Sequence, residues 1–153
     1  MYERVLVPLD GSKISEAALP YVVELASKLA PAGKIEVTLI HVISSLTHYV
    51  VAGEASARIP YTESEIKQIR KAARAYLNKA GKTLRSTGAI MKYEVRVGKA
   101  ANEIAKTADE INADLITMST HGRSGLSRWA FGSVTDKVLR GGNKPVLMVR
   151  APK

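Results

Sequence analysis

Strand-like and helix-like segments alternate along the whole chain, and this alternation is the feature that most restricts the fold. Short apolar runs predict strands, and apolar residues at three- and four-residue spacing between them predict helices. The expected strands are 4–10, 34–43, 91–97, 114–119 and 144–150, and the expected helices are 12–30, 62–88, 98–113 and 132–140. Such an alternation favours parallel strands joined by right-handed crossovers, with helices on both faces of the sheet.

The predicted architecture is a single α/β domain over 1–153, with a doubly wound, five-stranded parallel sheet of order 3-2-1-4-5. A chain of 153 residues has the usual length of one domain. In such a sheet, ligands bind outside the carboxyl ends of the strands where the strand order reverses. That point lies between the first and fourth strands here.

Several local signals refine this prediction. Ser12 can cap the first helix, and Pro20 within that helix should kink or unwind it. Thr62 and Glu65 form a capping box at the start of 62–88. The long connection 44–61 has two interpretations, a functional flap or a mobile loop.

Composition restricts the class of protein. The chain has no cysteine, which excludes disulfides and thiolate metal sites and fits a cytoplasmic protein. No signal peptide and no membrane span is expected. The formal net charge is +9, but the basic residues are dispersed, so a solvated surface is favoured and a nucleic-acid partner is expected to be absent.

Asp10 directly follows the first buried strand and precedes a helix. One interpretation is that it caps this helix beside Ser12. The other is that it binds a ligand, either a sugar hydroxyl or a metal near phosphate. The residues alone leave these two interpretations equally open.

A second unusual stretch runs from Met118 to Arg140, where a strand leads into a loop rich in Gly, Ser and Thr. Glycines let a ligand approach the main chain, and helix N-termini present free N–H groups to anions. A phosphate-binding loop is favoured over an ordinary turn with a serine cap. The stretch matches neither a Walker A loop nor a GxGxxG fingerprint.

The chain resembles the universal stress protein family. The family motif G-x-x-G, nine residues, then G-[S/T] aligns with Gly122, the insert "RSGLSRWAF", Gly132 and Ser133. "VLVPLDGS", "IHV", "DLITMSTHG" and "KPVLMVR" extend the resemblance over essentially the whole chain. Ser119 occupies the position of the first glycine, which is a departure from the motif. A serine there costs energy if the position needs positive φ, and is harmless if it needs only a small residue.

The resemblance implies a nucleotide site. Pro8 and Asp10 would line the adenine and ribose, and Val42 would contact adenine through its backbone. The ribose and phosphates would be bordered by Met118, Ser119 and Gly122. The phosphates would be held by Gly132, Ser133, Val134 and Thr135, with Arg123 as a further phosphate contact or a surface charge.

The function implied by this resemblance is an ATP-binding regulatory module of the stress response, with Mg²⁺ or Mn²⁺ optionally bound through the phosphates. No nucleophile–base pair is visible and the three histidines lack metal-ligand spacing, so neither an enzyme nor a protein metal site is expected. The alternative is a dimeric interaction protein that binds no nucleotide. In either case the apolar strand 145–149 is expected at a sheet edge, where it would pair with its twin in a homodimer.

Overall fold

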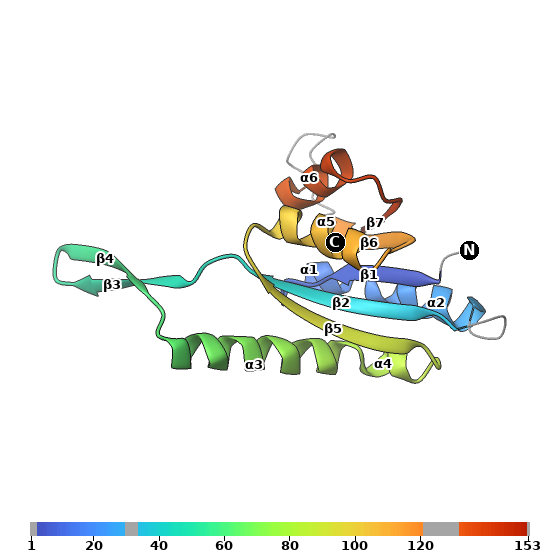
Figure 1. Cartoon of the computed structure of the whole chain (residues 1–153), viewed down its shortest axis with the longest axis horizontal. Helices are drawn as coiled ribbons and strands as arrows, with labels where there is room; N and C mark the ends of the chain where they lie inside the picture. The colour runs from blue at the N-terminus through green and yellow to red at the C-terminus, as the bar shows by residue number, and fades with distance from the viewer. Residues whose placement is uncertain (1–2, 30–33, 121–131, 153) are drawn as a thin grey trace.

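The computed structural model describes residues 3–29, 34–120 and 132–152. Its main sheet has five parallel strands in the order β5-β2-β1-β6-β7 (Figure 1). These strands are β1 Arg4–Pro8, β2 Glu36–Ile43, β5 Ile90–Val97, β6 Leu115–Thr120 and β7 Val146–Arg150. The α/β class and the predicted order 3-2-1-4-5 are therefore confirmed.

Helices cover both faces of this sheet. They are α1 Lys13–Glu16, α2 Leu19–Leu29, α3 Glu63–Ala80, α4 Lys82–Arg85, α5 Ala100–Glu110 and α6 Ser133–Gly141. In Figure 1, α5 and α6 lie on one side, and α3 and α4 lie along β5 on the other. A separate buried hydrophobic cluster lies on each face of the sheet. One is packed against α2, α3 and α4, and the other against α5 and α6.

β1 is the central strand and is buried on both faces. Val5, Leu6 and Val7 are each 0% exposed. Val5 and Val7 belong to the cluster beneath α2 and α3, whereas Leu6 belongs to the cluster beneath α5 and α6. A strand that packs on both sides has an uninterrupted apolar sequence, as "VLV" does here.

Two predicted helices are each divided. The first breaks between Glu16 and Leu19, just before Pro20, because proline lacks an N–H and its ring clashes with the carbonyl four residues earlier. This confirms the expected unwinding. The second breaks at Gly81, where a Cβ would lie 3.0 Å from the Tyr93 hydroxyl. Thr62 caps α3 as predicted, its hydroxyl accepting the Glu65 N–H at 3.2 Å.

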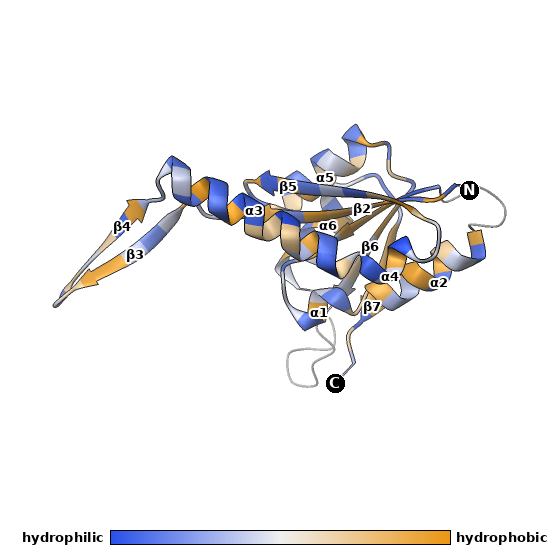
Figure 2. Ribbon diagram, turned by 90° about the horizontal axis from the view of Figure 1, so that it is seen from below, coloured by the Kyte–Doolittle hydropathy of each residue, from blue (hydrophilic) through white to orange (hydrophobic). Residues whose placement is uncertain are grey.

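The long connection 44–61 contains an antiparallel hairpin of β3 Thr47–Ala52 and β4 Ala55–Pro60. These two strands were not predicted. The hairpin projects away from the main sheet, and Figure 2 shows orange, hydrophobic segments along it. Tyr49 and Val51 are 68% and 70% exposed.

Asp114 joins the starts of β6 and β1. Its Oδ2 accepts the backbone N–H groups of Glu3 and Arg4 at 3.1 and 2.9 Å. The hydrogen bond from Arg4 is the largest influence on the pKa of Asp114, which lies below its usual value although desolvation opposes the shift.

We expect Asp114→Ala to lower the melting temperature by roughly 2–4 °C at pH 7, about 1 kcal/mol for the lost hydrogen bonds. Because the folded-state pKa is depressed, this stabilisation is fully present above the unfolded-state pKa and disappears as pH falls through the folded-state pKa. Circular dichroism melts of parent and variant should therefore differ at pH 7 and converge near pH 2.5. Asp109→Ala, on the surface of α5, is the control; an equal loss there, or a loss independent of pH, would contradict this account.

Candidate functional site

A cleft of about 210 Å³ lies at the carboxyl ends of β1 and β6, the point where the strand order reverses. Its walls come from the β1–α1 turn, the ends of β2 and β6, and the N-termini of α5 and α6. The lining residues are Pro8, Leu9, Asp10, Ile14, Ser15, Ile40, Val42, Ala100, Ile104, Met118, Ser119, Gly132, Ser133, Val134 and Thr135.

The structure brings the predicted site residues together. Every predicted residue within the described part of the chain lines this cleft: Pro8, Asp10, Val42, Met118, Ser119, Gly132, Ser133, Val134 and Thr135. Gly122 and Arg123 lie outside the described residues, as does the rest of the nine-residue insert. Segments more than 100 residues apart in sequence thus form one concave surface.

The turn after β1 is organised by serine hydroxyls. Asp10 Oδ1 accepts the Ser12 N–H at 2.8 Å, and Ser12 Oγ accepts the Ser15 N–H at 3.1 Å. Ser15 Oγ accepts the Asp10 N–H at 3.2 Å and donates to the Ser12 carbonyl at 2.9 Å. Gly11 between them has φ +88°, a conformation that strongly favours glycine. The sharp turn leaves Asp10 and Ser15 on the cleft wall.

Of the two interpretations left open for Asp10, the structure does not support the first, a direct cap of the helix. Ser12, not Asp10, is the helix cap, and Asp10 in turn binds the Ser12 N–H. Burial alone would raise the pKa of Asp10, but hydrogen bonds from Ser12 and Ser15 outweigh it, so the pKa lies below its usual value. An ionised carboxylate that lines the cleft can accept hydrogen bonds from hydroxyl groups such as those of a ribose.

The N-terminus of α6 faces the same cleft. Gly132 is its N-cap, and no side chain in the described part of the chain caps this end. The first-turn N–H groups of Ser133, Val134 and Thr135 have no helical carbonyl to pair with, which is the usual condition at a helix start. Free N–H groups and the positive end of the helix dipole suit an anion.

Gly132 has φ −52° and ψ 148°, a conformation open to every residue. The need for glycine there is therefore not conformational. Gly132 lines the cleft directly before Ser133, Val134 and Thr135, and as a glycine it adds no side chain there.

Ser119 lies within β6, paired with Val149 of β7. Its backbone is extended, so serine carries none of the strain that a positive φ would impose. The Ser119 hydroxyl donates to the Ile14 carbonyl in α1. The residue that departs from the family motif thus joins two walls of the cleft.

The remaining surface of the cleft is apolar. Pro8, Val42 and Met118, all expected from the sequence, lie beside Ile40 and Ile104, which were not. Leu9, Ile14, Ser15 and Ala100 are further lining residues that the sequence reasoning missed. In the sequence they belong to ordinary strand and helix patterns, and only the order of the strands places them at the cleft. An apolar pocket with a few polar groups is the common composition of a cofactor site.

The two histidines in the described part of the chain, His41 and His48, lie outside the cleft lining and contact neighbouring groups. His41 Nδ1 lies 2.8 Å from the Leu9 carbonyl, and its ring meets Tyr76 edge-on. His48 stacks on Tyr61 with ring centroids 4.6 Å apart. Over the described ranges, no cluster of three or more His, Cys, Asp or Glu could hold a metal ion. Within the same ranges, no helix is long and apolar enough to cross a membrane.

Comparison with known proteins identifies relatives over nearly the full length. The model of the universal stress protein family matches residues 1–150. Universal stress protein MJ0577 of Methanocaldococcus jannaschii is 31% identical over 98% of this chain and 96% of its own. Its solved structure superposes with a TM-score of 0.64 at 29% identity, covering 100% and 99% of the two chains.

Two further solved structures share the fold at lower identity. One is a universal stress protein in complex with cAMP, with TM-score 0.67, 22% identity, and coverage of 99% of this chain and 98% of that one. The other is the universal stress protein of Archaeoglobus fulgidus in complex with dAMP, with TM-score 0.63, 21% identity, and coverage of 96% and 97%.

Proposed function

The chain belongs to the universal stress protein family, and from this premise we propose that it binds an adenine nucleotide, ATP, in the cleft between β1 and β6. The observation that carries the proposal is the convergence of the motif residues on one cleft. Residues after β1, at the end of β2, in β6 and at the start of α6 line it together. Two universal stress proteins with this fold were solved in complex with adenine nucleotides, cAMP in one and dAMP in the other, which supports the proposal.

In this proposal the apolar part of the cleft holds the adenine. Pro8, Val42 and Met118 bury the base, with backbone groups of Val42 bonding its edge. The ionised Asp10 accepts ribose hydroxyls, and Ser119 borders the sugar. The phosphates lie against the first turn of α6, where Ser133 and Thr135 add hydroxyl donors to the free N–H groups. A divalent cation would be bound by the phosphates themselves.

We further propose a regulatory rather than a catalytic role. Asp10 is the only carboxylate among the described residues of the cleft, and in this proposal it accepts the Ser12 N–H and the ribose hydroxyls rather than the proton of an attacking water. A general base for an attacking water needs a free acceptor within hydrogen-bond reach. The cytoplasm, where ATP is abundant, is the compartment that fits this role and the lack of cysteine.

Equilibrium dialysis with radiolabelled ATP, followed by chromatography of the recovered nucleotide, tests both parts. We expect saturable binding of about one ATP per chain, with the nucleotide recovered largely intact after hours. No saturable binding at millimolar ATP, with or without Mg²⁺, would favour the non-nucleotide alternative. Rapid conversion to ADP would contradict the regulatory assignment.

An exposed edge strand supports an additional proposal, that the protein is a homodimer. β7 is the last strand at one side of the sheet, and Leu147 on it is 40% exposed. An unpaired apolar edge is a template for pairing with another strand, and an antiparallel pairing with its twin would cover it.

We expect Leu147→Lys to convert a dimer to a monomer, because two added charges would face each other across the paired strands. Light scattering at micromolar protein measures the mass. Ile90→Lys is the matched control, since Ile90 is 42% exposed on β5 at the opposite edge of the same sheet. A parent protein that is already monomeric, or a dimer lost equally in both variants, would count against pairing through β7.

A further inference from the structure

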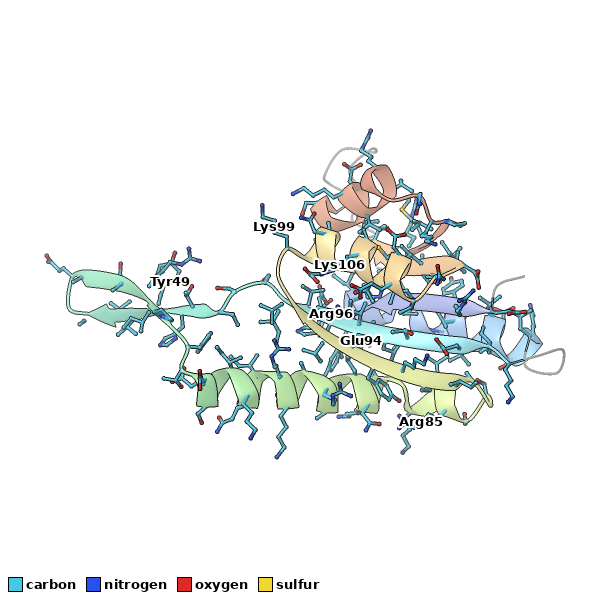
Figure 3. All side chains as sticks on the ribbon, viewed as in Figure 1. Tyr49, Arg85, Glu94, Arg96, Lys99 and Lys106 are labelled. Atoms are coloured by element: carbon cyan, nitrogen blue, oxygen red, sulfur yellow. The ribbon has the colours of Figure 1, made fainter. Side chains whose placement is uncertain are left out.

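The outer face of α3 and α4 is strongly basic. Seven cationic residues lie in 63–85, and all seven side chains are exposed: Lys67, Arg70, Lys71, Arg74, Lys79, Lys82 and Arg85. Figure 3 shows side chains of α3 that end in nitrogen and project away from the sheet, with Arg85 labelled beside α4. We call this surface the α3–α4 basic face.

The charge on this face is not balanced locally. The segment contains only two acidic residues, Glu63 and Glu65, both at the start of α3, so it carries +5 of the chain's formal +9. Across the described ranges, none of the seven cations lies within 4.0 Å of a carboxylate. Elsewhere in the described ranges, some basic residues are paired, as in Lys28–Glu24, Lys92–Glu36 and Arg96–Glu110, while scattered ones such as Lys13, Lys99 and Lys137 are not.

This arrangement works against helix stability. Lys67 and Lys71, and Arg70 and Arg74, are like charges four residues apart on one helix, a spacing that destabilises it. Neutral or alternating charges would solvate the face equally well. An anionic partner would offset the repulsion, so the uncompensated charge points to binding rather than to folding.

The apolar residues of α3 identify the kind of partner. Ala73 and Leu77 are buried, Ile66 and Ile69 are half-buried, and no large exposed hydrophobic residue of the described chain lies on α3 or α4. The outer face therefore has no apolar side chain to insert into a lipid bilayer. On α3 its cations lie at positions 67, 70, 71, 74 and 79, which span about 18 Å along the helix axis.

We propose that the α3–α4 basic face binds the phosphate backbone of a nucleic acid, without reading its sequence. A backbone offers closely and regularly spaced negative charges over this length, which a folded acidic protein does not. In the sequence these cations are dispersed, and this dispersal favoured the interpretation of an ordinary solvated surface. In the folded chain they share one face that lacks nearby carboxylates. This inference does not depend on ATP binding in the cleft.

Fluorescence anisotropy with a labelled 30-nucleotide single-stranded RNA and a 30-base-pair DNA duplex tests the proposal in about 50 mM salt, where backbone contacts are strong. We expect micromolar binding to at least one probe. The quadruple variant Lys67→Gln, Arg70→Gln, Lys71→Gln and Arg74→Gln should bind at least tenfold more weakly. Its slope of log affinity against log salt should be smaller by about 3, as expected for four lost phosphate contacts.

The matched control removes the same charge from paired positions: Lys28→Gln, Lys106→Gln, Arg140→Gln and Lys144→Gln. It should retain most of the affinity, while the basic-face variant keeps a cooperative melt at an equal or higher temperature. Equal losses in both variants would show that net charge alone is responsible and would overturn the proposal. The proposal would also be overturned if the protein bound neither the RNA nor the DNA probe. Tighter binding to phosphatidylglycerol vesicles or to polyglutamate than to both nucleic acids would overturn it as well.

Discussion

Gly132→Val is expected to abolish ATP binding, lowering the affinity at least 100-fold, while the protein still folds. Valine adopts the backbone conformation of Gly132, φ −52° and ψ 148°, without strain. Its side chain would occupy the space that phosphates need to reach the free N–H groups of Ser133, Val134 and Thr135. Loss of these contacts removes hydrogen bonds to a charged ligand, each worth about 1.5–3 kcal/mol.

Titration calorimetry with ATP measures this effect, and circular dichroism checks the fold. Gly141→Val is the matched control, because it places the same side chain at the opposite end of α6, where nothing lies within 4 Å of an added Cβ. We expect the control to bind ATP like the parent. A Gly132→Val protein that binds ATP normally would show that the phosphates lie elsewhere. If valine impairs folding, Gly132→Ala makes the same test with a smaller side chain.

The second large effect is stabilisation by the ligand. ATP at about one hundred times its dissociation constant should stabilise the folded chain by ~2.7 kcal/mol, because it binds the folded state alone. For a domain of this length the melting temperature should rise by roughly 5–10 °C. Differential scanning calorimetry with and without Mg²⁺ measures the shift.

Two comparisons identify the origin of this shift. Tripolyphosphate carries the charges of ATP without the base, so an equal shift would indicate charge binding at a surface such as the α3–α4 basic face. The quadruple glutamine variant of that face should retain the full ATP shift, since none of its substituted residues lines the cleft. A shift lost in this variant and kept in Gly132→Val would reverse the assignment of the two surfaces.

The main sheet could be predicted from the sequence because its strands pack on both faces. β1 contains the uninterrupted apolar run "VLV" and β2 is mostly apolar, and the right-handed crossover rule then leaves few strand orders. The hairpin of β3 and β4 could not be predicted in this way. These strands are mostly exposed; β3 shows no alternation of apolar and polar residues, and the alternation in β4 is carried mainly by alanine, a weak strand former.

Some residues of the candidate site could likewise be predicted from the sequence, and others could not. Asp10 is recognisable as a polar residue directly after a buried strand, and Ser119 and Gly132 through the resemblance to the family motif. Ile40 and Ile104 were missed because an aliphatic residue in a strand or helix has the same appearance whether it faces the core or a cleft. Their role depends on which strands are neighbours, which is information from the tertiary structure.

The central claim is that adenine nucleotide binds between β1 and β6 with its phosphates on α6. A crystal structure with a non-hydrolysable ATP analogue tests it most directly. We expect the adenine base to lie against Val42 and Met118 and the ribose to lie beside Asp10. Phosphate oxygens should lie within hydrogen-bond distance of the N–H groups of Ser133 to Thr135. An analogue located outside the cleft, or an empty cleft at saturating concentration, would contradict it.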